Sequence, residues 1–474
     1  MVSEQKKIQH LLLRAGFICP PGDIAALSKM SVKDVAQKLW NDSQAQTPLA
    51  SAPEEEETKL KDLPPDEKKE QKLKRALFTR GLNLEWLKIM CTTNAVFREK
   101  LTFFWHGHFA CHSILPHFAQ GLNNQLRQNA LGKFNDMLTA VSKSPAMLQY
   151  LNNEQNKKLS PNENFAREVM ELFTMGRGNY TEDDIKNAAR AFTGWRFNLS
   201  GEFLFAERQH DDDIKTFLGQ TGNYNGDDIL NIILQKPATA NFIVRKIYRY
   251  FVNENIDEDI CNTLATNFKA DYDIARLMYT IITSDWFYDE KNIGTRIKSP
   301  VELIVNLERA IPVTPTNPNA PIFVQRILGQ VLFNPPNVAG WKGGKNWIDS
   351  SSLMFRLSLP GIIFKQDEMN IQAKEDPEEA EHKMMQRNDE QEQQPAPRKQ
   401  GKLAATADWT AYLNAFRDVK DNDLYESICE YLIQVPQPDF KKETIMKYVT
   451  QDTRDEYIKT LTIALMSTPE YQMC

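Results

Sequence analysis

Hydrophobic positions along most of the chain recur at the three- and four-residue spacing of a helix face. The pattern is continuous over residues 73–200, and it resumes from residue 228 to about residue 311 and from residue 406 onward. Alternating runs typical of strands are few. We therefore predict a mainly α-helical fold with a large multi-helix core, irregular loops, few or no strands, and a smaller C-terminal helical part.

Three segments lack this periodicity. Residues 41–72 and 363–404 are rich in charged residues, glutamine and proline, which predicts mobile, solvated segments. Glycines in residues 201–228 predict a structured loop with one hairpin. The expected parts are N-terminal helices (1–40), a flexible acidic segment (41–72), the main helical core with any functional site (73–362), a charged linker (363–404) and a C-terminal helical segment (405–474).

Charge and composition limit the partners and the location. The 474 residues include 57 basic and 63 acidic residues, a net charge of −6, so we expect no nucleic-acid partner, which would need a basic face. No apolar run is long enough for a membrane span. The N-terminus has no secretory signal pattern, which predicts a soluble cytoplasmic protein, or a periplasmic or exported one if a leader has been removed. The six cysteines form no CxxC pair and no haem or iron–sulfur pattern.

The strongest chemical signal is a carboxylate on an apolar helix face. Glu168 shares helical spacing with Phe165, Val169 and Leu172. A carboxylate buried without a partner costs several kcal/mol, so Glu168 is expected to be paired, protonated or metal-bound.

The same helix carries a second set of charges. Glu163, Arg167 and Glu171 lie four residues apart, which predicts a ladder of surface ion pairs. Glu171 is also a candidate catalytic base beside Glu168, and Arg167 a candidate ligand contact.

Histidines in the segment FFWHGHF form another candidate site. His108 shares a predicted helix face with Trp105 and His112, whereas His106 projects from a different side. His106 and His108, together with Glu168, are candidate ligands for a divalent metal ion whose identity the sequence does not specify. Core or half-buried histidines that hydrogen-bond to carboxylates are the alternative.

The loop that contains HDDDIK offers a third set of polar groups. His210, Asp211 and Lys215 are candidate catalytic residues, and Arg190 on the preceding predicted helix is a candidate anion or ligand contact. Turn and helix-capping roles explain the same residues equally well.

A further loop is unusually rich in Gly, Pro and Trp. Trp341 and Trp347, with Lys342 and Lys345, could line a cleft for a saccharide or another polar ligand. The alternative is a packed loop held in place by its tryptophans.

These motifs resemble those of one bacterial family. RAGF at residues 14–17, FFWHGHF at 103–109, the helix–turn–helix at 162–195, RIKSPVELIV at 296–305 and the Trp-rich loop at 332–353 occur in the order found in DUF1800 proteins. The resemblance implies a large helical protein without an assigned activity. It also suggests a DUF1501-type protein as a partner, because the two families are often encoded side by side.

Two functional hypotheses follow. The first is an enzyme, a metal-assisted hydrolase with a His/Glu/Asp site in its helical core. The second is a non-catalytic binding or assembly protein that acts with a DUF1501-type partner. An enzyme requires His108, Glu168 and His210 to converge, whereas a binding protein would hold them in separate hydrogen-bond networks.

Overall fold

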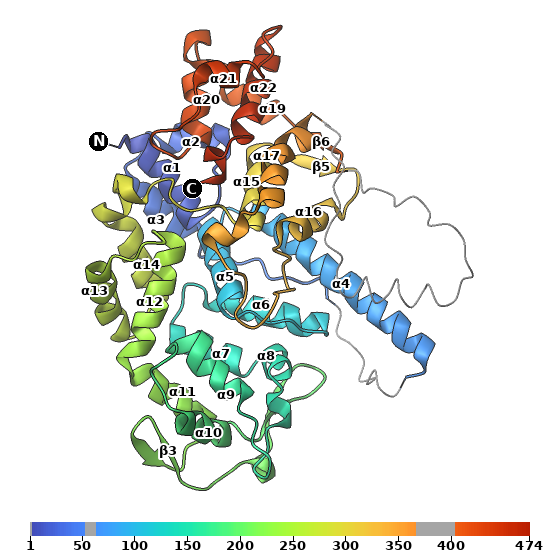
Figure 1. Cartoon of the computed structure of the whole chain (residues 1–474), viewed down its shortest axis with the longest axis vertical. Coiled ribbons are helices and arrows are strands. Elements are labelled where there is room, and N and C mark those ends of the chain that lie inside the picture. Colours follow the sequence, from blue (N-terminus) through green and yellow to red (C-terminus); the bar gives the residue numbers. More distant parts are fainter. Residues whose placement is uncertain (1, 53–62, 366–402) are drawn as a thin grey trace.

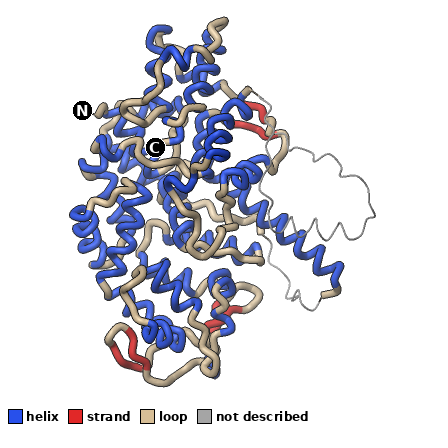
Figure 2. The backbone as a smooth tube through the Cα atoms, in the orientation of Figure 1, coloured by secondary structure: helices blue, strands red, loops and turns tan. Residues whose placement is uncertain are grey.

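The computed structural model describes residues 2–52, 63–365 and 403–474, and this part of the chain is mainly α-helical, as predicted (Figures 1 and 2). The first helices are α1 (Glu4–Ala15), α2 (Pro21–Leu27), α3 (Val32–Asp42), α4 (Pro65–Thr92), α5 (Val96–His108), α6 (Pro116–Asn129), α7 (Phe134–Ser142), α8 (Pro145–Tyr150), α9 (Asn164–Glu168) and α10 (Glu182–Ala191). They are followed by α11 (Gly226–Gln235), α12 (Pro237–Phe251), α13 (Glu258–Lys269), α14 (Ile274–Thr283), α15 (Pro300–Ala310), α16 (Ala320–Leu328), α17 (Ser350–Phe364), α19 (Thr410–Ala415), α20 (Leu424–Leu432), α21 (Lys442–Met446) and α22 (Arg454–Met466).

The strands form short antiparallel pairs within the described residues. They are β1 (Trp195–Phe197) with β2 (Phe203–Phe205), β3 (Lys215–Phe217) with β4 (Gln220–Gly222), and β5 (Val313–Pro315) with β6 (Ala405–Ala407). The region predicted to hold one hairpin therefore holds β3–β4 and the second strand of β1–β2. In the N-terminal part, where helices were predicted, Pro20 and Pro21 start a short helix, α2.

The core is built around α5. Every residue of α5 except Gly107 is buried, and the helix contacts α1, α3 and α6 (Figure 1). A helix that is buried on all sides must satisfy its polar side chains internally. The charged and histidine residues of α5 therefore determine where the polar sites of the core lie.

Glu302 links several elements at the centre of this core. Its carboxylate closes a capping box at the start of α15, accepting from the backbone N–H of Ser299 at 2.8 Å. The other oxygen, Oε1, accepts from Nζ of Lys100 on α5 and from Nη2 of Arg296. Arg14 of α1 lies nearby and donates to the carbonyl of Asn292 at 2.9 Å. Side chains from α1, α5 and α15 thus meet around one buried carboxylate.

The C-terminal helices pack against the N-terminal ones, although they are far apart in sequence (Figure 1). α19 contacts α2, α22 contacts α17, and β6 pairs with β5. Lys298 donates to the carbonyl of Tyr471 at 2.5 Å, and Arg356 donates to the carbonyl of Lys298 at 3.0 Å. Most of the predicted charged linker lies outside the described residues.

The helix α4 extends away from the body of the molecule (Figure 1). It begins at Pro65, inside the segment predicted to be flexible at residues 41–72. Leu73 and Leu77, one helical turn apart, are 46% and 54% exposed. None of the described helices is long and apolar enough to cross a bilayer.

We expect Glu302→Gln to lower the free energy of unfolding by about 3–5 kcal/mol, because Lys100 and Arg296 would remain buried without their carboxylate. Urea denaturation measures this change. The control is Glu426→Gln, which breaks an exposed pair with Lys442 at 2.9 Å and should cost less than about 1 kcal/mol. Equal small losses in both variants would contradict the central role of Glu302.

Candidate active site

A π-helical turn ends near α5, and two backbone carbonyls of its last residues accept from side chains. α9 runs directly into η3 (Val169–Thr174), which is a π-helix. The backbone N–H groups of Met175 and Gly176 both donate to the carbonyl of Met170, at 2.9 and 3.0 Å. The carbonyls of Leu172 and Phe173 instead accept from side chains. Such π-turns are frequent at functional sites.

The side chains of Lys246 and His108 form hydrogen bonds with these two carbonyls. His108, the last residue of α5, places Nε2 at 3.0 Å from the carbonyl oxygen of Phe173. Lys246 of α12 donates to the carbonyl of Leu172 at 3.0 Å, and its Nζ lies 3.2 Å from Nδ1 of His108. We call Lys246 and His108 the lysine–histidine pair.

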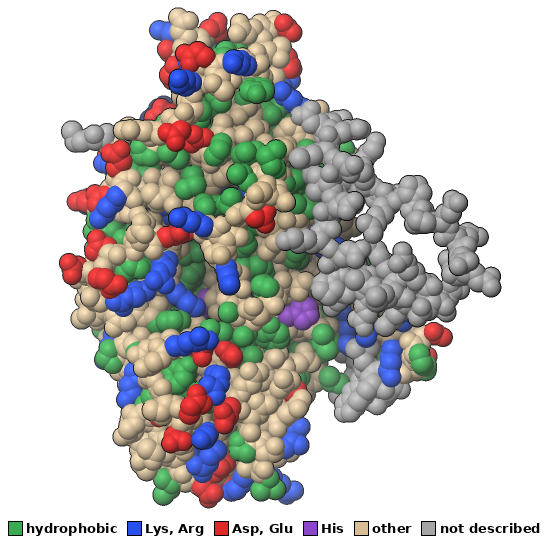
Figure 3. Space-filling model, viewed as in Figure 1, with side chains coloured by type: hydrophobic (Ala, Val, Ile, Leu, Met, Phe, Trp, Pro, Cys, Tyr) green, Lys and Arg blue, Asp and Glu red, His purple; other side chains and the backbone are tan. Residues whose placement is uncertain are grey.

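The hydrogen bonds define the protonation of the pair. A carbonyl oxygen only accepts, so Nε2 of His108 carries the proton and Nδ1 accepts from the Lys246 ammonium. Burial and the positive charge of Lys246 hold the pKa of His108 well below its usual value, so its ring is neutral. Burial and the nearby charge of Arg249 lower the pKa of Lys246 to about 8. Lys246 is half-buried, and Lys and Arg side chains gather over α12 on the face shown in Figure 3.

Glu168 lies on the helical turn before these two backbone carbonyls. It is half-buried rather than fully buried, and its carboxylate has no hydrogen-bond or ion-pair partner among the described residues. Burial and the neighbouring charge of Glu171 raise its pKa. Its charge in turn contributes to the raised pKa of Tyr150. The shifts of Glu168 and Lys246 are thus opposite in direction.

The predicted ladder along this helix forms only in part. Arg167 binds Glu163 at 3.3 Å as expected, but its other partner is Glu182, at 2.8 Å. Glu171 instead accepts from Nε of Arg177 at 2.5 Å and from the hydroxyl of Tyr180 at 3.1 Å. Arg167 therefore has an ion-pairing role at the surface.

His106 lies on a different side of α5 from His108. Its Nε2 accepts from the backbone N–H of Phe333 at 3.2 Å, and its ring packs against those of Trp86 and Trp341. Burial and the charge of Arg127 lower its pKa to about 3. This environment holds His106 as a neutral core histidine.

The two histidines are not arranged to share a metal ion. Both ring nitrogens of His108 and Nε2 of His106 are already engaged in hydrogen bonds. α5 ends at His108, so His112 does not continue its helical face. In the described ranges no three His, Cys, Asp or Glu side chains are grouped as metal ligands. The geometry does not fit the predicted metal site, which stays a prediction from sequence.

The residues of the HDDDIK loop form a separate network against α10. Nδ1 of His210 lies 2.9 Å from the carbonyl oxygen of Thr193, and Asp211 accepts from Nε of Arg190 at 2.8 Å. Lys215 donates to the backbone carbonyls of Asp211 and Asp213 at 2.5 and 2.9 Å. The bond from Arg190 to Asp211 attaches the loop to α10. None of these bonds connects the loop with His108 or Glu168, so the expected convergence of His108, Glu168 and His210 is not observed.

The Trp-rich loop packs closely on the end of α5. A side chain at Gly340, whose φ is +75°, would place its Cβ 2.5 Å from the carbonyl oxygen of Gly107, so the approach requires glycine. Trp341 is half-buried beside His106, and Trp347 is buried, whereas Lys342 and Lys345 are exposed. The two indoles therefore do not form a common exposed face for a sugar, and their ligand role stays a prediction.

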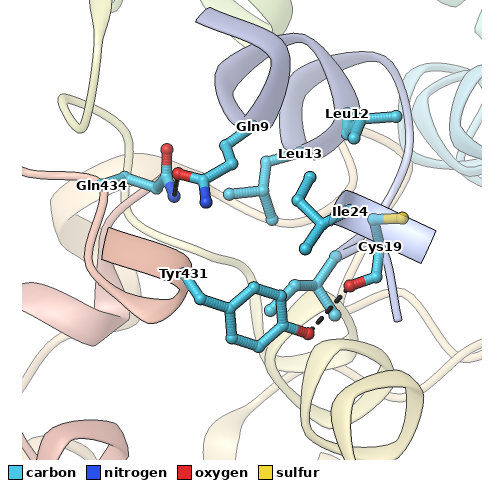
Figure 4. A pocket seen from close by; sticks show the side chains of 8 residues that line it. Gln9, Leu12, Leu13, Cys19, Ile24, Tyr431 and Gln434 are labelled. Carbon is cyan, nitrogen blue, oxygen red and sulfur yellow. Dashed lines mark hydrogen bonds between the residues drawn. The ribbon is translucent and has the colours of Figure 1, made fainter. Parts of the chain in front are cut away.

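A narrow, mainly apolar pocket lies elsewhere, between α1, α2 and α20 (Figure 4). Leu12, Leu13 and Ile24 form its walls. Gln434 donates to Gln9 at 3.4 Å inside it. Its lining contains no carboxylate, lysine or histidine, so it offers little acid–base chemistry.

Sequence reasoning missed Lys246 as a site residue. A usable signal was present, because Lys246 lies one turn after Ile243 and directly before Ile247, at the border of the apolar stripe of α12. The π-turn had no such signal, and it determines which carbonyls Lys246 and His108 reach.

Comparison with known proteins places these observations in a family. The model of the family described as "Protein of unknown function (DUF1800)" matches residues 10–473, nearly the whole chain. No curated protein and no solved structure matches the chain. An activity must therefore be argued from the residues themselves.

The lowered pKa of His106 predicts a pH-dependent stability. An unfolded histidine titrates near 6.5, so below that pH the unfolded chain binds a proton that the folded chain excludes. The contribution of neutral His106 is complete above pH 6.5 and is lost as the pH falls toward about 3. Between pH 6.5 and 5 this loss is about 1.5 kcal/mol.

Urea denaturation at both pH values tests this expectation with His106→Gln, which keeps an acceptor for Phe333. The variant should lose about 1.5 kcal/mol less than the wild type over this pH interval. An unchanged pH dependence would show that His106 is protonated in the folded protein.

Proposed function

This chain belongs to the DUF1800 family, described as a protein of unknown function, and we propose that it is an enzyme in which Lys246, His108 and Glu168 carry out acid–base chemistry. The observation that carries the proposal is the lysine–histidine pair, in which Nζ of Lys246 lies between Nδ1 of His108 at 3.2 Å and the carbonyl of Leu172 at 3.0 Å. A half-buried lysine with a pKa of about 8 can donate and regain a proton near neutral pH.

The opposite shifts of Lys246 and Glu168 support separate acid and base roles. The pKa of Lys246 is lowered and that of Glu168 is raised, and pairs of groups shifted in this way are typical of catalytic sites. Lys246 of α12 binds the carbonyl of Leu172, and Leu172 lies four residues after Glu168 along α9 and η3. No hydrogen bond or ion pair from the described residues occupies the Glu168 carboxylate, which leaves it free to act on water.

Hydrolysis of an ester-like bond is the reaction class that these roles fit best. Glu168 would take a proton from water as the water oxygen attacks the carbonyl carbon, and the Lys246 ammonium would give a proton to the departing alcohol oxygen. The proton on Glu168 then returns to Lys246 through solvent. Neutral His108 accepts a hydrogen bond from Lys246 and positions it. The rings of Phe104, Trp105 and Phe109 pack around His108 and exclude water from one side of the pair.

A divalent metal formed part of the hypothesis from sequence. Because His106 and His108 are engaged in other hydrogen bonds, the described geometry does not support their joint ligation of a metal. The proposed steps therefore use only side chains and water.

A binding or assembly role is the second candidate. The separate hydrogen-bond network of His210, Asp211 and Lys215 agrees with it. So does the projecting helix α4, which exposes Leu73 and Leu77 on one face (Figure 1). A DUF1501-type protein is the proposed partner in this case, with a saccharide or other polar ligand as a further alternative.

The acid–base proposal predicts that Lys246→Met and Glu168→Gln each lower ester hydrolysis at least about 100-fold, because each removes one proton-transfer group. Initial rates with 4-nitrophenyl acetate and 4-nitrophenyl butyrate, with folding checked by circular dichroism, measure the effect. Lys236→Met is the matched control, because Lys236 also donates to a backbone carbonyl, that of Leu218 at 2.8 Å, but lies outside the pair.

Rates should be unchanged in the control. A wild type that hydrolyses neither ester, or folded variants that retain full rates, would contradict this reaction class and favour the assembly role.

A further inference from the structure

The buried carboxylate of Glu302 is surrounded by more positive charge than it can balance. The residues Arg14, Lys100, Arg296, Lys298 and Arg356, which we call the cation cluster, are each at most 6% exposed. The charge of Glu302 acts on all of them. Cys474 also acts electrostatically on Arg14 and Arg296, and exposed Glu254 acts on Arg14 from the edge. Positive charge is therefore in excess.

The arginines of the cluster also have unused donors. Nε and Nη1 of Arg14, Nε and Nη2 of Arg356, and Nε of Arg296 are buried and have no acceptor in the described part of the chain. Buried guanidinium groups normally satisfy their N–H groups. Unused donors from three arginines around one carboxylate are thus an exception that calls for an acceptor.

Other buried arginines of the same protein show the ordinary arrangement. Arg98 donates to the carbonyls of Ser43 and Arg127, each at 2.8 Å. Arg127 in turn donates to both oxygens of Glu99, at 2.6 and 3.1 Å. All three nitrogens of the Arg127 guanidinium and two of the three in Arg98 have acceptors. Among the described residues, the buried arginine nitrogens that lack an acceptor therefore all belong to the cation cluster.

We propose that the cation cluster binds a small oxyanion, a phosphate, sulfate or carboxylate, through the free guanidinium edges of Arg14 and Arg356. Planar guanidinium groups match the oxygen spacing of these anions and bind them with charge-assisted hydrogen bonds. The anion supplies both the missing acceptors and the missing negative charge. Because Lys100 and Arg296 already bind Glu302, the edges of Arg14 and Arg356 are the ones that remain available.

The site has a structural consequence that is independent of the proposed activity. Arg14 belongs to α1 and Arg356 to α17, and the cluster also contacts Tyr471 near the last residue. A bound anion would join the two ends of the chain to the core. It would stabilise the folded protein by mass action, since the unfolded chain has no such site.

The first test uses the full chain purified without phosphate or sulfate. The protein is unfolded by heat, and the released anions are measured by ion chromatography. We expect close to one equivalent of released anion per chain. The retention time of the anion distinguishes phosphate, sulfate and organic carboxylate. A chain purified empty should instead gain about 2 °C in Tm with sodium phosphate or sodium sulfate over sodium chloride at equal ionic strength.

Variants then locate the site. Arg356→Met should abolish the released anion and the Tm gain, whereas Arg98→Met, which removes a buried arginine with satisfied donors, should retain them. If Arg356→Met does not fold, the released anion and the Tm gain of the wild type alone decide whether the site binds an anion. No released anion together with no anion-specific Tm gain would overturn the proposal, because ordered water would then fill the donors.

Discussion

Glu302 is a carboxylate that the fold removes from water, and its burial requires cations from distant parts of the chain. One oxygen binds Lys100 of α5 and Arg296, and the other closes the start of α15 through the N–H of Ser299. A buried carboxylate is tolerated only when its hydrogen bonds are complete. The positions of α5 and α15 are therefore coupled, and α5 in turn carries His106 and His108 at its C-terminal end.

The candidate site depends on that placement of α5 and on a second constraint, the π-turn of η3. The last carbonyls of a helix find no hydrogen-bond donor within the helix itself. In η3 the carbonyls of Leu172 and Phe173 are left for Lys246 and His108. The aromatic residues around His108 exclude water on one side, and this lowers the pKa of both members of the pair. The same helical segment carries Glu168, the proposed base, four residues before Leu172.

The sequence predicted the helical architecture because helix periodicity, caps and turn glycines are local properties. The capping boxes at Thr181–Asp184 and Ser299–Glu302 are local arrangements of this kind. It also identified His108 and Glu168 as residues on apolar faces. Lys100 occupies a similar position in an apolar helix but was not recognised, because only the tertiary structure shows its partner Glu302. The pairing of Lys246 with His108 likewise depends on a contact between distant segments. So does the separation of the HDDDIK loop from His108 and Glu168. Contacts of this kind leave no local pattern in a single sequence.

The proposed acid–base role depends most directly on the pKa of Lys246. Reductive 13C-methylation followed by NMR titration measures it, with the Lys246 signal assigned by its loss in Lys246→Arg. We predict a transition near pH 8, the value expected for an ammonium that is largely buried beside Arg249 and hydrogen-bonded to His108. A transition near the ordinary lysine value of 10.5 would contradict the account, because Lys246 would then be a solvated cation with no special acid–base role.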